Sequence, residues 1–290
     1  MEVILVDDGS DKPEAITCLD QLEADFNSRG WRIIRQQNSY LGAARNRAAQ
    51  EAKGKYLLFM DDDNVATSGE ISTFVQVAER TGIEILTCVI YLFEEPSAPT
   101  DVYDVWVPYG DAPGLSVLMN SFGDANALIN RETFEAVGGF TEEYGVGHED
   151  WEFFAKATLK GHSLEVIPEP LYYYRKTQDG MLNATNREQN LARSISPYLR
   201  AYPDFAPLFL FSQGLYEKQQ ESVTRTVQRY ANEIETLQAK LGQLQSDLND
   251  CRDELVESEK HYNQVTHSTI WRSTQIIRTV GGTLRRYWKN

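Results

Sequence analysis

The chain has 290 residues and carries 43 acidic side chains against 28 basic ones, a formal net charge of −15. This length allows one sizeable domain with an additional segment, and the negative charge argues against sequence-independent binding of nucleic acid. The widely spaced Cys18, Cys88 and Cys251 disfavour a disulfide framework or a zinc site and indicate a reducing compartment. Since the sequence has no membrane-length apolar run and no signal-peptide pattern, we expect a cytoplasmic protein.

Short apolar runs alternate with helical patterns over the first 60 residues. Residues 3–6 have the composition of a buried strand, and residues 13–28 carry apolar side chains at helical spacing. Residues 31–35 predict a second strand, the Ala- and Arg-rich residues 41–53 a second helix, and residues 55–60 a third strand. This alternation is typical of a parallel α/β sheet.

Aspartates follow two of these predicted strands. Asp7 and Asp8 come after the first strand, and Asp61, Asp62 and Asp63 come after the third. The carboxyl ends of parallel strands meet at one edge of a sheet, where ligands bind. We therefore expect both clusters to face one crevice, where Mg²⁺ or Mn²⁺ would offset their repulsion. A solvated turn is an equally good interpretation of the triplet by itself.

The middle of the chain predicts further strands around a long loop. Residues 85–90 form an apolar run, and residues 94–114 contain Pro and Gly breakers that predict a loop of the kind that binds or covers ligands. Residues 125–130 resume the apolar pattern, and residues 131–137 predict a short helix.

A second polar cluster precedes and opens a predicted helix. Glu149 and Asp150 lie in its first turn, where acidic residues favour the helix dipole and need no catalytic role. His148 could bind a metal, although a lone histidine is more often structural. Residues 164–167 predict a strand, and the aromatic run 171–175 follows it.

The order and spacing of these motifs resemble those of the family 2 glycosyltransferases of the GT-A fold over roughly residues 2–180. The resemblance rests on V-D-D-G-S at residues 6–10, G-A-A-R-N at 42–46, D-D-D at 61–63, G-G-F at 138–140 and E-D at 149–150. It implies a GT-A α/β domain over residues 1–200, Rossmann-like with a mostly parallel sheet. It also implies inverting transfer of a sugar from a nucleotide-diphosphate donor to a glycan or lipid-linked acceptor, in surface polysaccharide or glycan synthesis.

The resemblance implies donor-side roles for the two aspartate clusters. Asp7 and Asp8 would orient the nucleotide, with Asp8 contacting the base. Asp61 and Asp62 would lie on the ribose side. Asp63 would be the main ligand of the divalent cation, Mg²⁺ or Mn²⁺, and Asp61 would assist it.

The resemblance also implies roles around the acceptor. Asp150 would be the general base, with Glu149, Gly139 and Trp151 on the acceptor side. Arg45 would reach the diphosphate, although a solvated surface charge is an equal interpretation of this arginine.

The chain departs from the family pattern at two places. Thr177 stands where the family often has a histidine near the metal. The chain also begins directly on what should be the second strand, and a missing central strand leaves backbone groups unpaired. We therefore expect a fragment, a strand supplied by a neighbouring chain, or an impaired domain. A non-catalytic GT-A-like scaffold is the alternative function, whereas a nucleotidyltransferase would normally show a Gly-rich basic loop near its start, which is not visible.

The spacing of apolar residues changes in the last third of the chain. We predict a linker over residues 201–219, a coiled coil over 220–266 and a basic amphipathic tail over 267–290. Steps of four and three between seam positions indicate a coiled coil, and favour self-association over packing on the domain. This heptad seam consists of Val223, Val227, Tyr230, Ile234, Leu237, Leu241, Leu244, Leu248, Cys251, Leu255, Ser258, Tyr262 and Val265.

The predicted tail is basic, whereas the whole chain has a negative net charge. Residues 268–290 contain five basic side chains and no acidic one. Ile270, Ile277, Leu284 and Trp288 fall on one side of a helical wheel, which indicates contact with the cytoplasmic face of a membrane. Binding to an acidic partner is the other interpretation.

Overall fold

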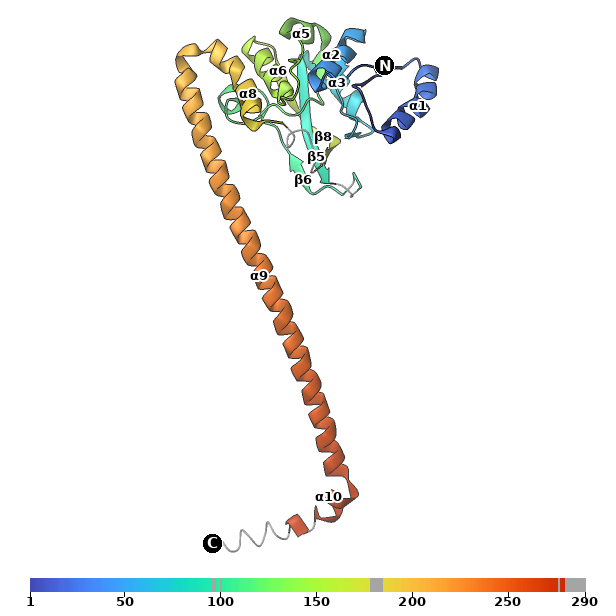
Figure 1. The fold of residues 1–290 in the computed structure, drawn as a ribbon, viewed down its shortest axis with the longest axis vertical. Coiled ribbons are helices and arrows are strands. Elements are labelled where there is room, and N and C mark those ends of the chain that lie inside the picture. The colour runs from blue at the N-terminus through green and yellow to red at the C-terminus, as the bar shows by residue number, and fades with distance from the viewer. Residues whose placement is uncertain (95–97, 100, 178–184, 276, 280–290) are drawn as a thin grey trace. The chain divides into compact units, whose positions relative to one another are not determined.

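The computed structural model describes residues 1–94, 98–99, 101–177, 185–275 and 277–279. The chain divides into two compact units, Met1–Tyr216 and Glu217–Asn290. Figure 1 shows that the strands belong to the first unit, and that the second is helical where it is described.

The elements expected in the first 60 residues are confirmed. The structure has β1 (Ile4–Asp7), α1 (Pro13–Ser28), β2 (Arg32–Arg35), α2 (Leu41–Glu51) and β3 (Tyr56–Leu58). Pro13 begins α1 at the first helical position, where its missing N–H costs nothing.

The rest of the first unit contains elements that the sequence pattern predicted only in part. It comprises β4 (Val65–Ala66), α3 (Glu70–Thr81), β5 (Ile85–Glu94), β6 (Asp104–Trp106), α4 (Pro113–Ser116), β7 (Leu128–Asn130), α5 (Arg131–Val137), α6 (Glu149–Leu159), β8 (Leu164–Lys176) and α8 (Arg187–Ala201). The predicted loop over 94–114 therefore contains a strand, β6. β8 joins the two runs predicted at 164–167 and 171–175 into one strand.

The strands form two sheets of mixed direction. β1 and β2 pair in parallel as a two-stranded sheet, and a six-stranded sheet has the order β3-β7-β5-β8-β4, with β6 on β5. β5 and β8 are parallel, whereas the other four pairs of the larger sheet are antiparallel. The α/β class is thus confirmed, but the sheet is not mostly parallel, and β1 and β3 belong to different sheets. Apolar runs locate strands without specifying which neighbour each strand takes.

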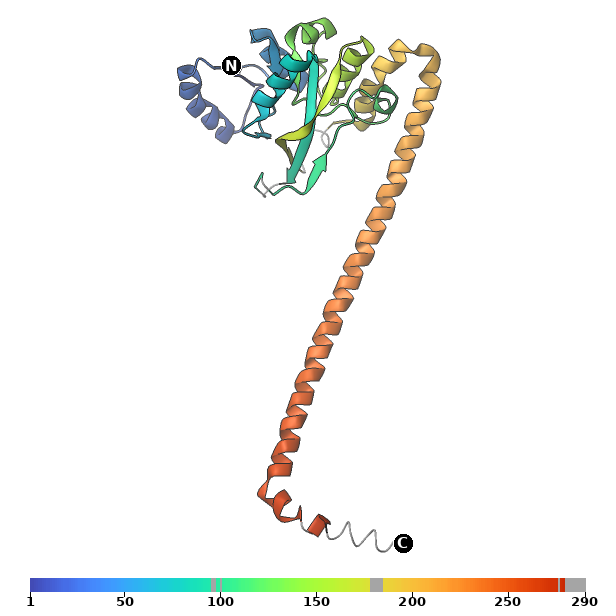
Figure 2. The ribbon, with the colours of Figure 1, turned by 180° about the vertical axis from the view of Figure 1, so that it is seen from behind.

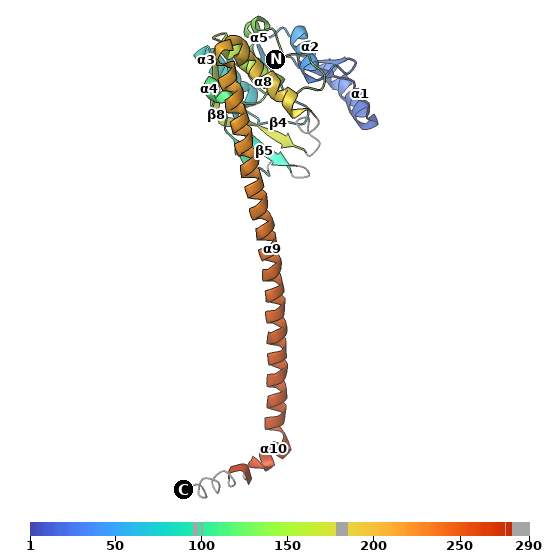
Figure 3. The same ribbon diagram turned by 60° about the vertical axis from the view of Figure 1, so that its left-hand side comes forward.

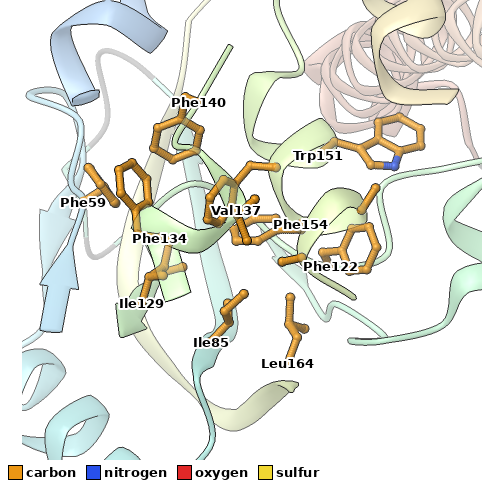
Figure 4. Packing of buried hydrophobic residues seen from close by; sticks show 14 of the residues in the cluster. Phe59, Ile85, Phe122, Ile129, Phe134, Val137, Phe140, Trp151, Phe154 and Leu164 are labelled. Atoms are coloured by element: carbon orange, nitrogen blue, oxygen red, sulfur yellow. The ribbon is translucent and has the colours of Figure 1, made fainter. Parts of the chain in front are cut away.

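Aromatic side chains from several elements form the core beside the larger sheet. Phe134 of α5 lies 5.3 Å, between ring centroids, from Phe59 and from Phe153, and 5.4 Å from Phe140. Figure 4 shows this cluster continuing towards Phe122 and Phe154. Aromatic pairs at this separation stabilise a core beyond their buried area. This packing holds the start of α6 in a defined position relative to the end of β3.

The turn after α5 requires glycine at residue 139. Gly139 has φ +71°, and a Cβ atom there would lie 2.7 Å from Oδ1 of Asn46. Gly82 has φ +72° and open space around it. We expect Gly139→Ala to lower the free energy of unfolding by about 1 to 3 kcal/mol more than Gly82→Ala, because only the first adds a clash to the left-handed strain. Urea denaturation of both variants measures the difference, and equal losses would rule out the clash.

Helix α9 (Ala206–His267) begins in the first unit and continues into the second. A 3₁₀ turn (Pro203–Phe205) leads into α9, and α10 (Thr269–Ser273) follows. Figures 2 and 3 show α9 without a break. Residues 206–219 of the predicted linker are helical: Pro207 lies in the first turn of α9, where a proline is tolerated.

Part of the predicted tail lies outside the described residues. Residue 276 and residues 280–290 are among these, so the helical wheel drawn through Leu284 and Trp288 remains a prediction. Within the described ranges, the structure has no helix that is both long and apolar enough to cross a membrane.

Candidate functional site

Arg45 on α2 is buried between carboxylates from two distant segments. Its Nη2 donates to both carboxylate oxygens of Asp61, at 2.7 and 2.9 Å, and its Nη1 donates to Oε1 of Glu149 at 2.5 Å. Burial by itself would lower the pKa of Arg45, but the charges of Asp61 and Glu149 outweigh it and raise the pKa. The guanidinium is therefore charged, and it joins Asp61, three residues after β3, to the first residue of α6. The burial of Arg45 contradicts its interpretation as a solvated surface charge, and its contact with the diphosphate stays a prediction.

The aspartate triplet after β3 divides between this ion pair and solvent. Asp61 is half-buried against Arg45, whereas Asp62 and Asp63 are exposed. Desolvation, followed by the charges of Asp61 and Asp62, raises the pKa of Asp63. The Asp63 carboxylate is thus open to solvent and close to like charges that a cation would offset.

The donor set fits a hard cation bound together with substrate oxygens. Among the residues that the structure describes, no three His, Cys, Asp or Glu side chains are arranged to hold a metal. Mg²⁺ commonly uses only one or two carboxylates, together with water and substrate phosphates. Asp63 is available for such a role. Asp61, the second predicted ligand, would have to share its carboxylate with Arg45.

Asp150 follows Glu149 in the first turn of α6, beside this ion pair. Burial, followed by the charges of Glu149 and Asp124, raises the pKa of Asp150 to about 8, and the charge of Arg45 opposes this rise. The backbone N–H of Trp151 donates to Oδ1 of Asp150 at 2.7 Å. A carboxyl with a pKa near neutrality is suited to exchange protons with a bound hydroxyl.

Asp7 and Asp8 lie in the turn that follows β1. Oδ1 of Asp7 accepts a bond from the backbone N–H of Ser10 at 2.9 Å, and Oδ1 of Asp8 accepts bonds from Gln36 Nε2 at 2.7 Å and from the Ser39 N–H at 2.9 Å. Across the described residues, no hydrogen bond or ion pair joins them to the triplet after β3. β1 and β3 belong to different sheets, and the shared edge for the two acidic clusters stays a prediction.

Helix α8 holds the loop before α6 in place. His148 has a left-handed φ of 62°, and its Nδ1 lies 2.8 Å from Oγ of Ser194. Asn190 accepts a bond from the Gly147 N–H at 2.7 Å, and Arg193 donates to two carbonyl oxygens of the same loop. Burial lowers the pKa of His148. Sequence patterns did not predict α8, so this support for the start of α6 was missed.

Two residues predicted on the acceptor side have structural roles. Trp151 is 5% exposed, packs in the core (Figure 4) and donates from Nε1 to the carbonyl of Ser116 at 2.9 Å. Its placement on the acceptor side stays a prediction. Gly139 allows the approach of Asn46, which exchanges two hydrogen bonds with the backbone of Phe140, at 2.8 and 2.9 Å.

Asp124 is a site residue that motif reading missed. Its Oδ2 accepts a bond from the buried hydroxyl of Tyr172 at 3.0 Å. Burial, followed by the charge of Asp61, raises the pKa of Asp124 to about 6, while Arg45 lowers it. A Gly-Asp pair directly before the apolar run 125–130 was the available signal.

The first part of the chain matches the model of a known protein family. Residues 1–137 match the model of the family described as "Glycosyl transferase family 2". This segment is similar to the family 2 glycosyl transferases. The matched segment contains Arg45, both aspartate clusters and Asp124, and it ends at the last residue of α5.

Two curated relatives of this chain come from Bacillus subtilis (strain 168). The "Putative glycosyltransferase EpsH" is 26% identical over 184 residues, which cover 60% of this chain and 52% of the relative. The "Uncharacterized glycosyltransferase EpsJ" is 31% identical over 194 residues, which cover 62% and 54%. The chain therefore spans about half the length of these relatives.

A solved structure shares the fold of this chain. The mannosyltransferase PcManGT from Pyrobaculum calidifontis, in complex with GDP-Man and Mn²⁺, superposes with a TM-score of 0.51 at 18% identity. The match covers 73% of this chain and 59% of that one. The GT-A type of α/β fold is confirmed.

Proposed function

We propose that this chain is an inverting glycosyltransferase that moves a sugar from a nucleotide-diphosphate donor to a hydroxyl of a glycan or lipid-linked acceptor. A role in surface polysaccharide or glycan synthesis is part of this proposal. The observation that carries it is the buried Arg45, which joins Asp61 of the donor-side triplet to Glu149, the neighbour of Asp150. The match of residues 1–137 to family 2 and the GDP-Man in the related mannosyltransferase support it.

In the proposed reaction the chain's own residues orient the donor and remove one proton. Asp7 and Asp8 bind the nucleotide. Asp150 takes the proton of the acceptor hydroxyl. At the same time the oxygen of this hydroxyl attacks the anomeric carbon from the side opposite the diphosphate. The bond to the diphosphate breaks in the same displacement, so the anomeric configuration inverts. Asp63, with Asp61 as a second ligand, would hold Mg²⁺ or Mn²⁺, which neutralises charge on the leaving diphosphate.

Metal-dependent nucleotide binding tests the proposal against the scaffold alternative. Calorimetric titration with UDP and with GDP should give binding in the presence of Mn²⁺ and none with EDTA. Asp63→Asn should weaken this binding by at least about tenfold, because a hard cation loses its main carboxylate. The exposed Asp253 of α9 provides the control Asp253→Asn, which should bind as the parent does. A scaffold predicts no metal-dependent binding by any of the three proteins.

The pH dependence of transfer should follow Asp150. Since a base must be ionised, kcat/KM should rise with pH through about 8, where this carboxyl loses its proton. Glu149→Gln removes a charge that raises this pKa and leaves more of the Arg45 charge facing Asp150, so the rising limb should move to lower pH. Glu165→Gln, at an exposed position on β8, should not move it. An unshifted limb in Glu149→Gln would contradict the assignment.

We also propose roles for the segments after the domain. The heptad seam of α9 supports association between copies of this chain. The basic tail over 267–290 supports peripheral contact with the cytoplasmic membrane face, a contact that co-sedimentation with anionic lipid vesicles would test. A chain that ends at His267 should lose the vesicle contact and keep its association.

A further inference from the structure

One face of the larger sheet carries part-exposed tyrosines. Residues that pair across neighbouring strands lie on the same face of a sheet. One such row crosses β6, β5, β8 and β4, and it consists of Val105, Tyr91, Tyr173 and Val65. Figure 1 shows β5, β6 and β8 together in the sheet. Tyr103, two residues before Val105, extends the row on the same side. These five residues are called the tyrosine face below.

Solvent reaches the tyrosine face, whereas the opposite face of the same strands is packed. Tyr103 and Val105 are 49% and 43% exposed, and the other three members are half-buried. On the opposite face, Ile90 and Tyr172 are buried together with Phe74 of α3. The tyrosine face is therefore an apolar surface that a ligand can reach.

The chemistry of this surface suits sugar rings. Tyr91 and Tyr173 stack with their ring centroids 5.3 Å apart and their planes 27° apart. Within the described residues, no hydrogen bond engages the hydroxyl groups of Tyr91, Tyr103 or Tyr173. Sugar rings present patches of C–H groups that pack on aromatic rings, and their hydroxyl groups need polar partners at the ring edges. The tyrosine face offers both kinds of contact.

Arg175 connects the tyrosine face to the aspartate triplet after β3. It lies two residues after Tyr173, on the same side of β8. Its Cζ lies 5.4 Å from the ring centroid of Phe93, and its Nε donates to the carbonyl oxygen of Asp63 at 3.1 Å. Asp63 is the proposed ligand of the cation on the donor diphosphate. A sugar chain on the tyrosine face would thus lead towards the place of transfer.

The edge of β6 argues against a second copy of this chain as the occupant. Among the described strands, β6 pairs with β5 alone, so its other edge is open. The N–H of Val105 already donates to Oδ1 of Asp104 at 2.8 Å. Glu94, Asp101 and Asp104 are exposed around β6, against Lys176 at the end of β8. This acidic surround would repel an identical edge or an anionic polymer, but not an uncharged glycan.

The width of the sheet sets the length of glycan that fits. Four strands enclose three spacings, so the row from Val65 to Val105 spans about 14 Å, the length of roughly three sugar units. A single sugar would cover only part of the row. The size of the surface therefore favours an acceptor that is already a chain of sugars.

We infer that the tyrosine face binds an uncharged acceptor glycan of at least three sugar units and leads its end towards Asp63. The inference rests on the proposed function and deepens it, because it selects a polymeric glycan over a lipid that carries a single sugar.

Affinity electrophoresis tests glycan binding without donor or metal. The acidic chain migrates in native gels that contain EDTA and dextran, galactomannan, arabinogalactan or mixed-linkage β-glucan. At least one of these neutral polysaccharides should retard it. In titrations with oligosaccharides of that polysaccharide, affinity should rise up to about three units and then level off. No retardation by any of the four, or retardation by the anionic alginate alone, would overturn the inference.

Two tyrosines of equal exposure provide the matched variants. Tyr103 on the tyrosine face and Tyr202 after α8 are both 49% exposed. Tyr103→Ala should weaken glycan binding by about three- to tenfold, because one aromatic contact is lost. Tyr202→Ala should bind as the parent does. Equal binding by the two variants would overturn the inference. A lower mass of Tyr103→Ala in sedimentation equilibrium would also overturn it, by making this face a contact between copies.

The failure of this inference is distinguishable from the failure of the proposed function. Nucleotide titration with Mn²⁺ tests the transferase and needs no glycan. Normal nucleotide binding without glycan retardation would leave the proposed function and remove the glycan site. Glycan retardation without metal-dependent nucleotide binding would remove the proposed function, and with it the role of the tyrosine face as an acceptor site.

Discussion

Asp150→Asn should lower the rate of sugar transfer by a factor of about 100 to 10,000, the usual contribution of a positioned general base. An amide cannot take the proton of the acceptor hydroxyl, but its oxygen can still accept the bond from the Trp151 N–H that Asp150 accepts at 2.7 Å. The local fold should therefore persist. Transfer kinetics, followed by release of nucleoside diphosphate, measure the loss.

Donor binding is the control for this variant. Because Asp7, Asp8 and Asp63 are expected to contact the donor, the affinity of Asp150→Asn for UDP or GDP with Mn²⁺ should stay within about twofold of the parent. Stability should not fall, since burial disfavours the charged form of Asp150 and raises its pKa to about 8. Transfer at the parental rate would show that another group is the base.

Arg45→Ala should lower the free energy of unfolding by about 3 to 5 kcal/mol, because removal of one member of a buried ion pair leaves uncompensated charge. Its side chain is 8% exposed, and both Asp61 and Glu149 lose their partner. These two carboxylates should then repel each other across the vacated space. Urea denaturation of the variant and the parent at pH 7 measures the change.

Arg47 provides the matched control on the same helix. Its side chain is 46% exposed and pairs with Glu51 one turn along α2. Arg47→Ala should cost no more than about 0.5 kcal/mol. If Arg45→Ala were equally mild, the ion pair would not hold the two segments together. Asp61→Asn in the Arg45→Ala background should recover part of the loss, because one of the uncompensated charges is gone.

Local patterns were sufficient for the first elements of the fold. The apolar run before Asp7 and the helical spacing after Pro13 predicted β1 and α1, which the structure confirms. Sheet pairing was not accessible in this way, since it depends on which strands meet after folding. α8 was missed for a different reason, because Pro197 lies inside it and a proline is expected to interrupt a helix.

The site was predictable where a motif marked it. Asp61, Glu149 and Asp150 were identified from their motifs, and the structure places Asp61 and Glu149 on one arginine. Burial could not be read in the same way. For Arg45 a diphosphate contact and a solvated surface charge were equal interpretations. The burial of Trp151 could not be predicted, because its hydrogen-bond partner Ser116 lies far away along the chain.

The two-stranded sheet of β1 and β2 should unfold locally more readily than the larger sheet. All four residues of β1 are only part-buried, and a pair of strands by itself has marginal stability in water. Amide protons of β1 should therefore exchange with deuterated solvent well before those of β5, whose residues 85 to 90 are buried. The Asp7–Asp8 turn lies at the end of this early-opening element, so a nucleotide bound there should slow its exchange more than that of any strand in the larger sheet.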